Sequence, residues 1–359
     1  MASVDLHRRD AVLLTAMLST ETANVAMNTL FKAATSKGLN SYTFLVYSYL
    51  IGSLLLLLPS HQFFSNRSRS LPPLSFSILC KIGLLGLLGS TYQITGFIGI
   101  VYSNPTLSSA ISNINPAITF ILAVIFRMEK ASLKERSSVA KMLGTLVSLI
   151  GALVVVLYHG PRVFTESSPP HPQLRQLSPP FSSSNSDWII GGSLLAIKDT
   201  LVSVAFILQA HIMNEYPAPL TVSFIYFSFS SILISCIGFI AEKNNPSMWI
   251  LRFDITLLCI LFGGIFNPAY YAIHLWAVRN KGPVYLAIFR PLSILIAVIM
   301  GAIFLGDFLY LGSLVGGILI SLGFYTVMWG KAKEEKAKLL SLSEEAPLLI
   351  NSKDDQISV

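Results

Sequence analysis

The sequence predicts an all-α membrane protein in which ten transmembrane helices form two five-helix repeats of opposite orientation. Of the 359 residues, 53% are apolar and 12% are charged, about half the charged fraction of an ordinary soluble domain. The apolar runs are continuous and long enough for crossings of about 20 residues, whereas strands of a membrane barrel would alternate over about ten. The two halves of the chain also carry the same marker residues.

Ten apolar runs, bounded by charged residues or by Pro, Gly and Ser clusters, predict the helices. They cover residues 11–33, 40–59, 75–101, 105–127, 137–158, 188–210, 218–241, 254–277, 283–305 and 311–330. The predicted organisation is therefore an N-terminus (1–10), a first repeat (11–158), a Pro- and Ser-rich linker (159–187), a second repeat (188–330) and a C-terminal tail (331–359).

The distribution of basic residues predicts that both termini face the cytosol. Fifteen of the 25 Lys and Arg residues lie in segments on the side of the termini and six on the other side, which is the asymmetry that membrane insertion favours. The net charge of +7 is explained in this way, and no basic patch interleaved with aromatic residues indicates nucleic acid. The three cysteines lie inside apolar runs without paired spacing or His neighbours, so neither disulfides, a metal site nor a cofactor is predicted.

Matching residues in the two halves predict an internal duplication. Tyr92 precedes Pro105 by thirteen residues, and Tyr270 precedes Pro283 by the same distance. A repeat with an odd number of crossings starts its second copy from the opposite side of the membrane, which is the inverted repeat of many secondary transporters. Further pairs, at similar shifts, are Pro116 with Pro291, Gly144 with Gly316 and Gly151 with Gly323. The glycines predict small-residue faces that let helices pack closely.

Four segments resemble one family. They are 115–129 (NPAITFILAVIFRME), 289–294 (FRPLSI), 304–317 (FLGDFLYLGSLVGG) and 323–331 (GFYTVMWGK). They resemble plant drug/metabolite transporters of the EamA type, the nodulin-like, Walls-Are-Thin-related proteins also called usually-multiple-acids-move-in-and-out transporters. The resemblance runs from about residue 10 to 331 and implies movement of amino acids, or of auxin in some members, across the plasma membrane or the vacuolar membrane.

Charged side chains inside the predicted spans are the first candidates for a site, since each costs about 2.5–3.5 kcal/mol at mid-bilayer on insertion scales. Glu21 shares one helix face with Asn24 and Asn28, and this polar stripe lines a cavity or bonds to a neighbouring helix. Lys198 has nearly the same place in the second repeat as Glu21 has in the first, which predicts a Glu21–Lys198 ion pair. Asp199 lies about 100° further around the same helix, so we expect it to face another helix.

Arg290 precedes Pro291. Because proline has no N–H, the carbonyl of Ala287 is expected to be free one turn earlier. A guanidinium beside free backbone is suited to hold a substrate carboxylate through two hydrogen bonds. The alternative is that Arg290 extends to the cytosolic boundary.

Other polar and aromatic residues complete the predicted substrate site. They are Tyr92, Gln93, Asn113, Tyr270 and His274. His274 is a possible proton relay or a packing residue. In the tail, an acidic residue followed after three positions by two leucines within 344–350 resembles a sorting signal, so a sorting adaptor is a possible partner.

Three function classes remain open. The first, which the resemblance implies, is a secondary transporter of small organic solutes such as amino acids, with protons as a possible coupling ion. A carrier of phosphorylated sugars or other organic anions is the second, and it predicts several cations in the cavity. The third is a membrane receptor or scaffold. An enzyme is not predicted, since no catalytic motif is found in the sequence.

Overall fold

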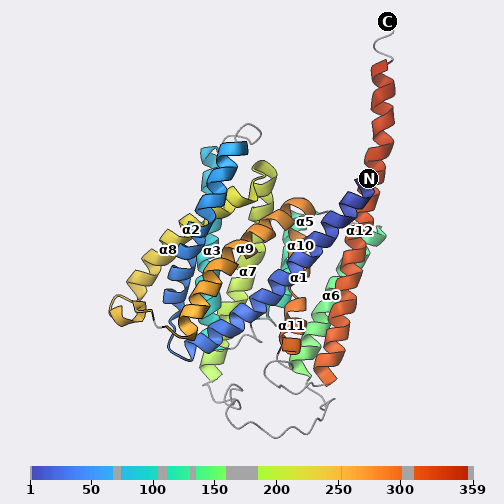
Figure 1. The fold of residues 1–359 in the computed structure, drawn as a ribbon. Helices are drawn as coiled ribbons and strands as arrows, with labels where there is room; N and C mark the ends of the chain where they lie inside the picture. Colours follow the sequence, from blue (N-terminus) through green and yellow to red (C-terminus); the bar gives the residue numbers. More distant parts are fainter. Residues whose placement is uncertain are drawn as a thin grey trace.

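The protein is a bundle of helices (Figure 1). The structure, a computed structural model, describes residues 2–67, 74–103, 108, 111–129, 135–158, 185–251, 253–300 and 311–354. Within these segments the regular elements are all helical, in the order α1 (Ala2–Thr35), α2 (Ser41–Arg67), α3 (Phe76–Tyr102), η1 (Ser112–Ile114), α5 (Asn115–Ile125), α6 (Arg136–Leu157), α7 (Asn185–Glu215), α8 (Pro219–Ala241), η2 (Pro246–Trp249), α9 (Ile255–Lys281), α10 (Pro283–Ile288), α11 (Leu292–Met300) and α12 (Leu311–Asp354).

The long helices run between two ends of the bundle (Figure 1). We call the end where α1 begins and where α12 extends beyond its neighbours the terminal end, and the other, where α1 and α3 finish and α7 starts, the opposite end. At the terminal end, Lys281 Nζ pairs with Asp10 at 2.9 Å, and Lys331 donates to the Lys281 carbonyl at 2.8 Å. Both termini therefore lie on one side of the bundle.

The lengths and composition of the helices suit a lipid bilayer. Five helices in the described segments are long and apolar enough to cross a membrane. Large apolar side chains point outward from the bundle, with Leu54 67% exposed and Ile240 78% exposed. Inside the bundle, Phe31, Phe44 and Phe97 pack edge to face or tilted, with ring centroids 4.5–5.0 Å apart. This outward apolar surface is what a polytopic membrane protein requires.

Helices α6 and α12, the last of each repeat, lie side by side along one flank of the bundle (Figure 1). A Cβ on Gly144 would lie 2.7 Å from the Gly323 carbonyl oxygen, and a Cβ on Gly151 would lie 2.8 Å from the Gly316 carbonyl oxygen. Ser148 donates to the Ile320 carbonyl at 3.4 Å between them. This contact, which we call the glycine seam, agrees with the small-residue faces that the sequence predicts.

One helix that the sequence predicts as continuous is interrupted, and in another a short 3₁₀ segment runs directly into the α-helix. The predicted helix 283–305 consists of α10 and α11, separated by Phe289, Arg290 and Pro291. The predicted helix 105–127 is described as η1 followed by α5, and Pro105 lies outside the described residues. Proline disfavours helical backbone at the residue before it, which explains the break at Arg290. The expectation of a free Ala287 carbonyl was wrong, because the Arg290 N–H donates to it at 3.1 Å.

The described helices are also longer than predicted at several ends. α12 continues to Asp354 instead of ending near 330, because residues 331–340 are rich in Ala, Lys, Glu and Leu, which favour helix. The predicted sorting signal at 344–350 falls within this helix. Most of the predicted linker, residues 159–184, lies outside the described residues.

Four charged side chains gather at the terminal end. Glu129, which follows α5, pairs with Lys331 at 2.9 Å and with Lys141 at 2.8 Å, and Lys141 also pairs with Glu334 at 2.7 Å. Burial acts to raise the pKa of Glu129, but the two ammonium groups outweigh it and lower that pKa below its usual value. These residues, the terminal-end ion cluster, tie α6 and α12 to the end of α5.

Candidate functional site

A polar cavity of about 100 Å³ lies inside the bundle, lined mainly from α1, α2, α3, α7, α8, α9 and the α10–α11 break. Since one water needs about 10–15 Å³, the cavity has room for several waters or a small solute. Eight of the ten residues that the sequence predicts for the site line it: Asn24, Asn28, Tyr92, Gln93, Lys198, Tyr270, His274 and Arg290. Glu21 and Asn113 are buried outside its lining.

Glu21 lies on α1, one turn before Asn24. Its side chain has no exposed surface, and neither carboxylate oxygen has a hydrogen-bond partner among the described residues. Arg290 and Lys198 both attract it electrostatically. Asn24 and Asn28 line the cavity from the same helix. Glu21 is thus a buried acid whose charge is balanced from a distance, behind the cavity wall.

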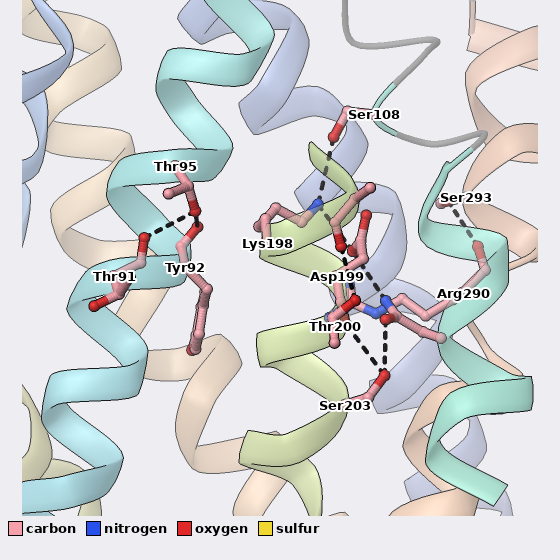
Figure 2. Close-up of polar contacts among 12 residues, drawn as sticks. Thr91, Tyr92, Thr95, Ser108, Lys198, Asp199, Thr200, Ser203, Arg290 and Ser293 are labelled. Carbon is pink, nitrogen blue, oxygen red and sulfur yellow. Dashed lines mark hydrogen bonds and ion pairs between the residues drawn. The ribbon is translucent and has the colours of Figure 1, made fainter. Parts of the chain in front are cut away.

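The predicted Glu21–Lys198 ion pair is replaced by a different one. Lys198 Nζ lies 3.1 Å from Asp199 Oδ1, although the two residues are neighbours on α7 (Figure 2). The two side chains leave α7 in different directions, but the four-carbon lysine stem lets the ammonium bend back to the adjacent carboxylate. Lys198 lines the cavity with its side chain 17% exposed, whereas the Asp199 side chain is 2% exposed.

Asp199 also faces another helix, as the sequence analysis expects, although the partner residue was not predicted. Asn115, at the start of α5, donates from Nδ2 to Asp199 Oδ1 at 3.0 Å, and Ser203 donates to Asn115 Oδ1 at 3.0 Å (Figure 2). The sequence contained a usable signal. Asp199 follows Glu21 at the same separation at which Tyr270 follows Tyr92, so Asp199 rather than Lys198 is the counterpart of Glu21.

Arg290 occupies the break between α10 and α11, and its side chain points toward Asp199 and Ser203 on α7 (Figure 2). Its guanidinium carbon lies 5.7 Å from the centre of the Phe206 ring, a cation–π contact. Arg290 Nε has no hydrogen-bond partner among the described residues. Since Arg290 lines the cavity, it does not extend to the cytosolic boundary.

Tyrosines form the uncharged part of the cavity wall. Tyr226 and Tyr271 stack at 4.0 Å with ring planes 7° apart, and the Tyr226 hydroxyl lies 3.2 Å from that of Tyr92. Gln93 donates to the Tyr49 hydroxyl at 2.8 Å. The sequence reasoning missed Tyr49, Tyr226 and Tyr271, because a tyrosine inside an apolar run has the same appearance whether it faces the cavity or lipid.

Several polar atoms near the cavity have no partner in the described part of the chain. They are Gln209 Oε1, Asn267 Nδ2, Tyr271 Oη and His274 Nε2, all on cavity-lining residues that are 9% exposed or less. His274 packs against the Tyr270 ring at 3.9 Å. A buried polar group without a partner is costly, so these atoms fit a cavity filled by water or by a polar solute. The described residues hold no group of three metal-ligating side chains.

Comparison with known proteins gives the family. The family model described as "EamA-like transporter family" matches residues 11–157 and 190–329. WAT1-related protein At3g28130 of Arabidopsis thaliana is 83% identical over 99% of this chain and 100% of its own length, and WAT1-related protein At3g28100 of the same plant is 70% identical over 97% and 99%.

A solved structure has a similar fold. It was solved by crystallography, superposes with a TM-score of 0.60 over 88% of this chain and 98% of its own chain, and is 14% identical in sequence. The predicted all-α membrane fold with an inverted repeat is therefore confirmed, and so is the resemblance to plant proteins of the EamA type. The chain is an integral, multi-pass membrane protein that belongs to the EamA-like transporter family.

Proposed function

We propose that this protein moves amino acids or related organic acids, including auxin-related acids, across a membrane by alternating access. The observation that carries the proposal is the polar cavity, which presents two cations, Lys198 and Arg290, beside unpartnered donors and acceptors. A zwitterion needs both a cation for its carboxylate and an anion or acceptor for its ammonium group. The cavity and the acids behind it offer both.

Arg290 is assigned to the substrate carboxylate. Its fork of N–H donors matches a carboxylate through two parallel hydrogen bonds, and Arg290 Nε is unpartnered among the described groups. Glu21 is fully buried behind the cavity wall, so it attracts the ammonium group without touching it or carries a coupling proton. The tyrosines shape the pocket and contact the body of the substrate. No catalytic step is proposed.

A carrier of phosphorylated sugars is the second candidate. A phosphate with about two negative charges calls for several cations in direct contact, and Lys198 and Arg290 are the two found in the described lining. The nearby acids Glu21 and Asp199 offset both. This balance favours a substrate of zero or single negative charge. A receptor or scaffold would not depend on Arg290 for flux.

The orientation and the target membrane belong to the same proposal. The fifteen basic residues on the side of the termini support a cytosolic terminal end. The plasma membrane and the vacuolar membrane are the proposed locations, and the acidic dileucine pattern in the tail supports the vacuolar one through a sorting adaptor.

The test is flux through purified protein in lipid vesicles, with radiolabelled amino acids, indole acids and sugar phosphates, with and without a pH gradient. Arg290→Gln should reduce amino-acid flux at least tenfold, because a hydrogen bond to a charged group contributes about 1.5–3 kcal/mol. Arg290→Lys keeps the charge and should retain part of the flux. Arg8→Gln, at an exposed arginine, is the control. Unchanged flux in Arg290→Gln at equal protein amount would remove Arg290 from the site and the proposal with it.

A further inference from the structure

We propose that Lys198 is a second anion-binding cation of the cavity, that Asp199 and Asn115 hold it in place, and that it determines the affinity for substrate entering from the opposite end only. The inference rests on the proposed transport function and adds a direction to the site. The two repeats contribute their cavity cations from different positions.

The two repeats place their acids in equivalent positions. Asp199 is the second-repeat counterpart of Glu21, and Arg290, which precedes Pro291, is the counterpart of Asn115, which precedes Pro116. Asp199 accepts a hydrogen bond from Asn115, and Glu21 is attracted to Arg290. In each case an acid on the first helix of one repeat interacts with the residue before the proline of the other repeat, through a hydrogen bond for Asp199 and electrostatically for Glu21.

The two half-sites differ in where their cation comes from. In the first, the cation is Arg290 itself. In the second, the corresponding residue is the neutral Asn115, and the cation is Lys198, supplied by the same helix as the acid. The residue that corresponds to Lys198 in the first repeat is Thr20, so this lysine has no counterpart. The cavity therefore has two cations that are not related by the duplication.

The surroundings of Lys198 hold its ammonium at the cavity surface. Its stem passes over Gly96 of α3, where a Cβ would lie 2.7 Å from Lys198 Cδ. Its Nζ contacts Asp199 at 3.1 Å and Ser108 at 3.5 Å. Because Asp199 is itself fixed by Asn115 at 3.0 Å, the carboxylate holds the lysine from behind, and the rest of the ammonium faces the cavity. Asp199 and Asn115 are positioning residues for Lys198.

Lys198 lies nearer the opposite end than the deeper part of the cavity does. Gln209, which also lines the cavity, comes eleven residues later on α7, and this corresponds to about 16 Å along a helix. Lys198 lies against Gly96, in the last third of α3, which finishes at the opposite end. Arg290 lies seven residues from Pro283, where α10 begins at the terminal end. A substrate entering from the opposite end therefore meets Lys198 before Arg290.

Under alternating access, the order in which a substrate meets Lys198 and Arg290 depends on the side from which it enters. Inverted repeats exchange their conformations when the cavity changes the side to which it opens. Lys198 lies on the opposite-end side of the cavity, so it is in the entry path when the cavity opens to that end and in the closed part when the cavity opens to the terminal end. Its contribution to binding is then confined to one side, whereas Arg290, deeper in the cavity, serves both.

The experiment measures apparent affinity separately from each side. Protein reconstituted in vesicles is sorted by the accessibility of its C-terminal tail, and uptake of radiolabelled L-glutamine is measured for each orientation. Lys198→Gln should weaken the apparent affinity from the opposite end about tenfold, which corresponds to about 1.4 kcal/mol, and less than twofold from the terminal end. The double variant Lys198→Gln/Asp199→Asn avoids a buried unpaired acid and should show the same sidedness. Lys198→Arg should restore affinity.

The control is Lys37→Gln, which removes an exposed lysine at the opposite end, outside the cavity, and should change neither affinity. Equal weakening from both sides, or no weakening in either Lys198 variant, would overturn the inference while the proposed transport function stands. Absence of flux of every amino acid and indole acid tested in the wild-type protein, or full flux in Arg290→Gln, would instead overturn the transport proposal and this inference together.

Discussion

Replacing Gly144 by alanine tests how much the glycine seam stabilises the bundle. A Cβ at this position would lie 2.7 Å from the Gly323 carbonyl oxygen and 2.7 Å from Val327 Cγ2, whereas ordinary contact begins at 3.4 Å. The difference means that α6 and α12 must separate locally by about 0.7 Å, because the nearest atom is backbone and cannot rotate away. Overpacking of this kind costs about 1–3 kcal/mol.

The same substitution also has a favourable part, since alanine is about 1 kcal/mol better than glycine in a helix interior. Gly83→Ala, in the interior of α3, is the matched control. Its Cβ would lie 3.7 Å from the Phe229 ring, which is ordinary contact. Both variants gain helix propensity, but only Gly144→Ala disturbs a close contact. The free energy of unfolding should therefore be about 1–3 kcal/mol lower in Gly144→Ala than in Gly83→Ala.

Thermal unfolding in detergent micelles, followed by tryptophan fluorescence, measures this difference. Gly144→Ala should unfold at a lower temperature than both the wild-type protein and Gly83→Ala. If Gly144→Ala unfolds at the same temperature as Gly83→Ala or above it, the close approach of α6 and α12 at the glycine seam does not stabilise the protein.

Two further predictions concern the terminal end. Glu129→Gln removes the shared partner of Lys141 and Lys331 and should lower the free energy of unfolding at pH 7 by about 3 kcal/mol, the lower limit for a broken buried pair, because Lys141 keeps Glu334. Folding lowers the pKa of Glu129, so its contribution to stability is complete above the ordinary carboxyl pKa and is lost as the pH falls through the lowered pKa. Gly282→Ala should cost about 1–3 kcal/mol, because φ is +82° and ψ is 174° at this residue, a backbone region open almost only to glycine.

Both predictions are measured by the same unfolding assay. A Glu129→Gln variant whose difference from the wild-type protein grows as the pH is lowered would contradict the ion-pair interpretation. Gly38→Ala is a second test of the same effect, since Gly38 also has a positive φ, of +97°, and connects α1 to α2. If neither alanine variant lowers the unfolding temperature, backbone strain is not what keeps glycine at these turns.

The sequence predicted the spans and the seam well because both depend on local composition. Apolar runs of sufficient length determine where a chain can cross lipid, and the seven-residue spacing of glycines in both halves determines which helix face can approach a neighbour. The 3₁₀ segment before Asn115 and the break at Arg290 were harder to predict. Each proline marked the position, but the sequence did not show whether the helix would bend, continue or split there.

The polar contacts could be predicted only in part, because they depend on side-chain reach and on tertiary neighbours. Helical geometry placed Lys198 and Asp199 on different faces, yet a lysine stem spans that angle and the two pair at 3.1 Å. The charges of the terminal-end ion cluster were visible in the sequence as loop and helix-end residues. Nothing local shows that Glu129 and Lys331, 202 positions apart in the chain, meet at 2.9 Å.

The contacts across the glycine seam are reciprocal. In the order of the chain, Gly316 and Gly323 of the second repeat correspond to Gly144 and Gly151 of the first, and yet Gly144 approaches Gly323 while Gly151 approaches Gly316. When position i of one copy meets position j of the other, and j meets i, the interface is isologous, as in a homodimer with two-fold symmetry. The flank of this molecule thus keeps the geometry of a dimer whose two subunits have become a single polypeptide.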